Sequence, residues 1–179
     1  VNPSGLELDY EEMSEAFRGN PHGAGFAVAL GDSVLVRKGY FSFRRLWADY
    51  VQCEGLASIL HFRYATAGVV GKENCHPFKI TPKLAMIHNG ILPGRSTAAR
   101  SDTRCLANDV LRPHADLIFD DLFKGSMERR IGPGNKLAFL QADGEVSIYN
   151  EGSGHWRGGV WYSNYCYLPR VSYRAQAEA

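Results

Sequence analysis

The sequence contains no long apolar run, few cysteines and almost no net charge. No stretch approaches the about 18 apolar residues of a membrane-spanning helix, and residues 1–5 lack the basic and apolar pattern of a signal peptide. The four cysteines form no C-x-x-C pair, which excludes a disulfide-stapled miniprotein and favours free thiols. The formal net charge of +1 argues against a nucleic-acid binder. We therefore expect a soluble, cytoplasmic protein that binds neither membranes nor nucleic acid.

The remaining composition is that of a globular protein. Of the 179 residues, 45% are hydrophobic and 12% aromatic, which is enough to build one buried core. No internal repeat or linker divides the chain. Residues 1–169 are therefore predicted to form one domain, and the polar residues 170–179 a C-terminal tail.

The hydrophobic pattern predicts short strands and helices in an irregular order. Capping residues start the helical patterns, and two pairs of strands flank turns that contain glycine, as in β-hairpins. Hairpins without a regular βαβ alternation favour antiparallel sheets with helices packed outside, an α+β architecture. The expected strands are 25–30, 33–38, 57–63, 84–89, 136–140, 146–149 and 159–163; the expected helices are 9–18, 43–54, one that opens at 101–102, and 115–123; 67–82 is an expected loop.

Polar residues gather where the predicted strands end. Taken singly, each has an ordinary role, since Asn-Gly usually only makes a turn. Taken together, they fit one chemistry: an Arg fork binds a carboxylate, an Asp holds an ammonium, and an Asn amide beside a Gly N–H gives two donors to an oxyanion. The pattern predicts an α-amino acid ligand with a second carbonyl open to attack. The residues are His61, Arg63, Thr66, Asn74, His76, His88, Asn89, Gly90 and Asp102.

Four runs of the sequence resemble, in order and spacing, the glutaminase domain of class II glutamine amidotransferases. They are His-Phe-Arg-Tyr-Ala-Thr-Ala-Gly at 61–68, Asn-Cys-His-Pro-Phe at 74–78, Ala-Met-Ile-His-Asn-Gly-Ile-Leu at 85–92 and Ser-Asp-Thr at 101–103. Residues 20–26 are similar to the Asp-Gly-x-Gly segment of that family, and 161–164 to its closing strand. The resemblance spans nearly the whole chain and is greatest to small stand-alone members encoded by bacteriophages.

The resemblance implies a fold, an activity and a role for each site residue. The fold is that of an N-terminal-nucleophile hydrolase, an αββα sandwich of two antiparallel sheets between helical layers. The activity is hydrolysis of the side-chain amide of L-glutamine to glutamate and ammonia, without cofactor or metal. Arg63 would bind the α-carboxylate and Asp102 the α-ammonium, with Thr66 nearby. Asn89 and Gly90 would form the oxyanion hole. Position 67 is Ala where some members have His, a departure that the family tolerates.

The nucleophile of the family is a cysteine at the chain terminus, with its own α-amine as general base. Here the chain starts at Val1, and the cysteines are internal, at 53, 75, 105 and 166. Residues 2–5 resemble the loop that follows the first strand of the family, so we expect about five to seven further residues upstream, beginning Met-Cys. Loss of that buried strand would cost roughly 1.5–3 kcal/mol for each large side chain exposed. The alternative is an inactive, phage-encoded binding or assembly module, located in the host cytoplasm or the virion.

The sequence also bears on metal, nucleic acid and protein partners. His61, His76, His88 and Asp102 lack the short spacing of a metal site, and the paired arginines at 44–45 and 129–130 are isolated. Besides L-glutamine, the resemblance implies an ammonia acceptor, for which 179 residues leave no room. A separate ammonia-accepting synthetase, or a phage or host protein, is therefore the expected partner.

Overall fold

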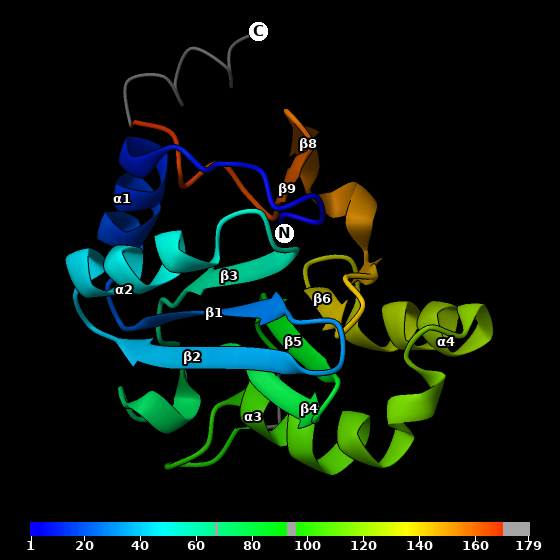
Figure 1. Ribbon diagram of the computed structural model, residues 1–179. Coiled ribbons are helices and arrows are strands. Elements are labelled where there is room, and N and C mark those ends of the chain that lie inside the picture. The colour runs from blue at the N-terminus through cyan, green and yellow to red at the C-terminus, as the bar shows by residue number, and fades with distance from the viewer. Residues whose placement is uncertain (67, 93–95, 170–179) are drawn as a thin grey trace, which may run out of the picture.

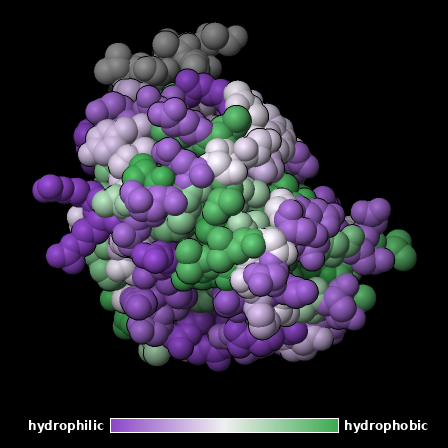
Figure 2. Space-filling view, viewed as in Figure 1, coloured by the Kyte–Doolittle hydropathy of each residue, from purple (hydrophilic) through white to green (hydrophobic). Residues whose placement is uncertain are grey.

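The computed structural model describes residues 1–66, 68–92 and 96–169. The predicted tail at 170–179 and position 67 lie outside these residues. No helix in the described ranges is both long and apolar enough to cross a membrane. On the face shown in Figure 2, hydrophilic residues surround a smaller hydrophobic region near the centre.

The chain forms two antiparallel sheets with helices on their outer sides, and one small third sheet (Figure 1). Strand order is β2-β1-β3 in the first sheet, β4-β5-β6-β7 in the second and β8-β9 in the third. The strands are β1 Ala24–Ala29, β2 Val34–Tyr40, β3 Ser58–Phe62, β4 Phe78–Thr81, β5 Leu84–Asn89, β6 Lys136–Gln141, β7 Val146–Tyr149, β8 His155–Arg157 and β9 Val160–Tyr162; the helices are α1 Tyr10–Gly19, α2 Phe43–Tyr50, α3 Asp102–Leu106 and α4 Asp121–Ile131.

Successive side chains of the central strands point alternately to the helices and to the other sheet, and this explains the order of the layers. On β1, Phe26 and Val28 pack with residues of α1 and α2, whereas Ala27 between them faces the second sheet. On β5, Met86 packs with residues of α3 and α4, whereas Ala85 faces the first sheet. Small alanines between the sheets let the two backbones approach closely. The order is therefore helices, sheet, sheet, helices, which confirms the predicted αββα sandwich.

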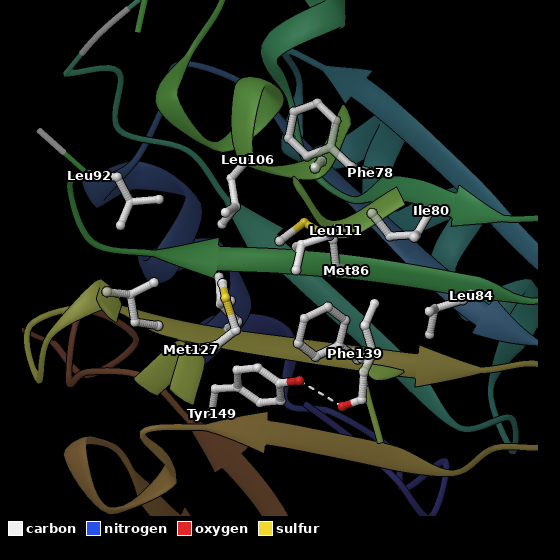
Figure 3. Close-up of a cluster of buried hydrophobic side chains, with 14 residues drawn as sticks. Phe78, Ile80, Leu84, Met86, Leu92, Leu106, Leu111, Met127, Phe139 and Tyr149 are labelled. Carbon is white, nitrogen blue, oxygen red and sulfur yellow. Dashed lines mark hydrogen bonds between the residues drawn. The ribbon is translucent and has the colours of Figure 1, made fainter. Parts of the chain in front are cut away.

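The outer core between the second sheet and its helices contains one buried polar bond (Figure 3). Tyr149 is 0% exposed, and its hydroxyl donates to the carbonyl oxygen of Ile118 at 2.6 Å. We expect Tyr149→Phe to lower the free energy of unfolding by about 1–3 kcal/mol, because a buried acceptor loses its donor. Urea denaturation measures this change. Tyr10→Phe, at an exposed ring, should change it by less than about 0.5 kcal/mol, and equal losses in both variants would contradict the expectation.

Several element predictions are confirmed. The hairpin of β1 and β2 turns at Gly31, whose φ is +91°, and the hairpin of β6 and β7 turns at Gly144, whose φ is +95°. Helix α1 begins after Asp9, whose carboxylate accepts the N–H of Glu12 at 2.8 Å. All four cysteines are free.

Other predictions were wrong in detail. The expected loop 67–82 contains β4, in which Phe78 and Ile80 are buried and alternate with an exposed lysine. The helix expected at 115–123 is instead a 3₁₀ segment, Arg112–Leu117, followed by α4, because the carboxylate of Asp120 accepts the N–H of Phe123 at 2.8 Å and starts a new helix.

Two further differences concern short elements. The helix expected to reach residue 54 ends at Tyr50 and continues as one 3₁₀ turn, Val51–Cys53, and the side chain of Ser42 makes no capping bond. Strand β8 was not expected, because it has three residues, of which two are polar. It pairs with β9 across Gly158 and Gly159, both at positive φ.

Candidate active site

A cavity of about 210 Å³ lies where β3, β5 and α3 meet. Because β3 belongs to the first sheet and β5 to the second, the cavity spans the end of the sandwich. Eight of the nine polar residues that the sequence singles out line it, including the five with predicted roles: Arg63 and Thr66 follow β3, Asn89 ends β5, Gly90 comes next, and Asp102 begins α3. Asn74 does not line the cavity; its side chain donates to the carbonyl of Ala99 at 2.8 Å and accepts the N–H of Ser101 at 3.0 Å. The fold thus brings together residues from three separate segments, while their roles stay predictions.

Arg63 is held by the backbone on both sides. Its N–H donates to the carbonyl of Gly23 at 2.8 Å, and its carbonyl accepts the N–H of His22 at 3.0 Å. The residue is only 4% exposed. Burial lowers the pKa of Arg63, and the nearby Cys75 and Asp102 partly offset this effect. A guanidinium still keeps its charge at neutral pH, so the cavity has a fixed cation in its wall.

Asp102 provides the opposite charge. The N–H of Leu92 donates to its Oδ2 at 2.7 Å, and the N–H of Thr103 donates to its Oδ1 at 2.7 Å. These two bonds fix the plane of the carboxylate. Oδ1 also accepts the hydroxyl of Thr103 at 3.3 Å, whereas Oδ2 accepts one bond and retains a lone pair, so Oδ2 can still accept a bond from an ammonium in the cavity. An arginine and an aspartate in one wall can together bind a zwitterionic α-amino acid group.

Gly90 has a backbone that only glycine adopts easily. Its φ is +135°, and a Cβ atom there would lie 2.3 Å from Oδ1 of Asn135 and 2.8 Å from the carbonyl oxygen of Gly134. The preceding side chain, Asn89, accepts a hydrogen bond from Nζ of Lys136 at 3.3 Å through its Oδ1. An amide side chain next to a constrained glycine N–H is an arrangement that can stabilise an oxyanion.

The histidines next to the cavity are packed into hydrogen-bonded and ring contacts. Nδ1 of His88 lies 2.7 Å from Oγ1 of Thr103, and its Nε2 lies 2.9 Å from Oδ1 of Asn135. The rings of His61 and His76 are in contact, with centroids 3.9 Å apart and planes tilted by 34°. Burial lowers the pKa of His61 to about 3 and that of His76 well below its usual value, so both rings are neutral at pH 7.

Metal binding is the alternative role for these histidines. Across residues 1–66, 68–92 and 96–169, no three His, Cys, Asp or Glu side chains are grouped in a way that could hold a metal ion. The buried Nδ1 of His61 has no hydrogen-bond partner in these ranges, and His61 lines both the large cavity and the groove that adjoins it.

The adjoining groove has a volume of about 120 Å³ and runs along β3 and β9. Val1 and Asn2 line it and form backbone hydrogen bonds with both elements. The amine of Val1 donates to the carbonyl of Trp161 at 2.8 Å, and the N–H of Trp161 donates back at 2.9 Å. Asn2 exchanges two bonds with Ser58, at 2.8 and 2.9 Å. Burial lowers the pKa of the Val1 amine to about 5.

Sequence reasoning missed Lys136 and Asn135 as neighbours of the site. Both depend on the pairing of β5 with β6, in which Asn89 lies opposite Lys136. The one signal available was a lysine at the start of an otherwise apolar strand. Such a residue is usually placed in solvent, so the signal alone does not point to a site.

The chain is similar to known proteins in sequence and in structure. The glutamine–fructose-6-phosphate aminotransferase (isomerizing) of Thermococcus kodakarensis is 38% identical over 72 residues, which are 38% of this chain and 12% of that protein. The glutamine phosphoribosylpyrophosphate (PRPP) amidotransferase from B. subtilis complexed with ADP and GMP has a similar fold, with a TM-score of 0.54 and 22% identity, over 83% of this chain and 37% of that chain. No protein-family model matches the sequence.

The chain therefore corresponds to a small part of each longer protein. Both relatives carry glutamine in their names, and the second has the same layered arrangement of antiparallel sheets and helices. This confirms the resemblance that the four sequence runs predicted. The chain thus resembles class II glutamine amidotransferases in sequence, and it has the αββα fold of the N-terminal-nucleophile hydrolases.

Proposed function

We propose that this domain hydrolyses the side-chain amide of L-glutamine to glutamate and ammonia. The observation that carries the proposal is the cavity that Arg63, Asp102 and Asn89 share. The first two have the charges that bind the α-carboxylate and the α-ammonium of an amino acid. The third, with Gly90, offers N–H donors to a carbonyl oxygen that becomes negative during attack.

We propose that the nucleophile is a cysteine that begins a strand preceding Val1. The antiparallel pairing of Asn2 with Ser58 sets the register of that strand, because each step back from Asn2 moves one step forward along β3. The residue before Val1 would lie opposite Leu60, and the third residue before it opposite Phe62. The next positions would reach Arg63 and the large cavity. This path follows the groove that lies along β3 and β9.

The backbone pairing of Val1 and Asn2 supports the same proposal, because Val1 pairs with Trp161 on one side and Asn2 with Ser58 on the other. A strand that continues upstream would also pair the backbone groups of β3 that face the groove.

The proposed reaction has two steps. The α-amine of the terminal cysteine takes the thiol proton, and the thiolate attacks the side-chain carbonyl of glutamine. The N–H donors of Asn89 and Gly90 stabilise the tetrahedral oxyanion, which collapses to a thioester as ammonia leaves with the proton. Water then hydrolyses the thioester to glutamate. Arg63 and Asp102 hold the α-amino acid group throughout.

Ammonia from this reaction needs a consumer. We propose an ammonia-accepting synthetase, of phage or host origin, as the partner, and a cytoplasmic location for the reaction. The alternative of an inactive binding or assembly module predicts the same fold without turnover.

The natural protein, with its own N-terminus, tests the proposal. Its intact mass and N-terminal sequence should show a terminal cysteine a few residues before Val1. Incubation with L-glutamine should release glutamate and ammonia in equal amounts, and 6-diazo-5-oxonorleucine should label that cysteine alone. Labelling of Cys53, Cys75, Cys105 or Cys166 instead would falsify the mechanism. A folded protein that neither turns over glutamine nor reacts supports the inactive module.

A further inference from the structure

Lys136 is a basic residue whose side chain reaches the proposed oxyanion site from a neighbouring strand. It is the first residue of β6 and lies opposite Asn89, the last residue of β5, in the antiparallel register. Its Nζ donates to Oδ1 of Asn89 at 3.3 Å. Both residues line the groove beside His88.

The ammonium of Lys136 has no counter-ion in the part of the chain that the structure describes. The ion pairs formed there involve other residues, and Asn89 is the hydrogen-bond partner of its side chain. Burial lowers the pKa of Lys136, which reflects the cost of keeping a charge there. A partly buried lysine without a carboxylate leaves positive potential in the groove, where it can act on a negative charge that forms nearby.

The bond to Lys136 also sets the orientation of the Asn89 side chain. An ammonium has three donors and no acceptor, so it can bind the amide only through Oδ1. The amide is planar, and its NH₂ group therefore lies on the other side of the Cγ atom. Without Lys136, the amide could turn over and present its oxygen to the oxyanion, which would be repulsive. Asn89 lines both the cavity and the groove.

We propose that Lys136 is a positioning residue for the glutaminase reaction, holding Oδ1 of Asn89 so that the amide NH₂ faces the oxyanion. The inference rests on the proposed function, in which Asn89 is an oxyanion donor. The effect arises only when negative charge forms, so it belongs to kcat and not to the binding of glutamine.

Kinetics of the natural protein with L-glutamine test this inference. Lys136→Met removes the charge but keeps the length of the side chain, and should lower kcat by about 10- to 100-fold with KM within about threefold. Lys136→Arg keeps a donor and a charge, and should recover kcat to within about fivefold of the wild type. Lys79→Met, at an exposed lysine of β4, should leave both constants unchanged and serves as the control.

A double variant separates positioning from a general loss of structure. If Lys136 acts through Asn89, the pair Lys136→Met and Asn89→Ala should be hardly slower than Asn89→Ala alone, whereas independent effects would multiply. Thermal melting of each variant excludes unfolding as the cause, and Lys136→Leu provides a second side chain without charge or donor if the methionine variant does not fold. Unchanged kcat in a folded Met or Leu variant overturns the inference and leaves the proposed function standing. A wild-type protein without glutaminase activity overturns both.

Discussion

Replacing Asn89 by alanine is expected to lower kcat for glutamine hydrolysis by about 10²–10³, while KM stays near the wild-type value. The side chain faces an oxygen that gains negative charge only as the tetrahedral intermediate forms. It therefore contributes little to the binding of glutamine and much to the barrier. Steady-state kinetics measure both constants, and single-turnover experiments establish whether KM follows affinity.

A loss of kcat in Asn89→Ala must be distinguished from damage to the turn that contains Gly90. Gly90 follows directly, and its positive φ and close contact with Asn135 depend on the local backbone. Thermal melting should therefore accompany the kinetics. Asn108→Ala, at a partly buried asparagine that lines neither cavity, is a matched substitution and should leave kcat unchanged. If Asn89→Ala instead raises KM with kcat intact in a stable protein, Asn89 is a turn residue and not an oxyanion donor.

The sequence predicted the parts of the fold that local chemistry determines. The hairpin at Gly31 and the cap at Asp9 depend on residues close in sequence, and both are confirmed. Strand β4 depends on pairing with β5, and its four residues have too little pattern to stand out from a loop. The helix expected at 115–123 begins later, because the carboxylate that caps it is that of Asp120.

In the candidate site, too, some features were predicted from the sequence and others needed the structure. The side chains at Arg63, Asn89 and Asp102 were predicted because they lie in runs whose order and spacing resemble a known family, and the structure brings them to one cavity. The contact between Asn89 and Lys136 joins residues 47 positions apart and depends on strand register. A single sequence does not show which residues of two strands face each other, so this contact needed the structure.

Arg63→Ala and Asp102→Ala are expected to raise KM by about 10- to 150-fold each, with a smaller change in kcat. Each variant loses charge-assisted hydrogen bonds worth roughly 1.5–3 kcal/mol, to groups whose charge is the same in the substrate and the transition state. Arg63→Lys keeps the charge but loses the planar fork, so its KM should lie between those of the wild type and Arg63→Ala. Asp102 also accepts two backbone N–H bonds, so Asp102→Ala should in addition lower the melting temperature.

Two truncated substrates assign each residue to its group. 4-Aminobutanamide is glutamine without the α-carboxylate, and glutaramate is glutamine without the α-amino group. If Arg63 binds the carboxylate, Arg63→Ala should hardly change kcat/KM for 4-aminobutanamide, which has no carboxylate. With glutaramate, it should lower kcat/KM by the same factor as with glutamine. Asp102→Ala should show the reverse pattern. This comparison separates binding from loss of structure, because a distorted cavity lowers kcat/KM for all three substrates alike. Equal losses with every substrate would show that Arg63 and Asp102 support the cavity wall without binding the amino acid group.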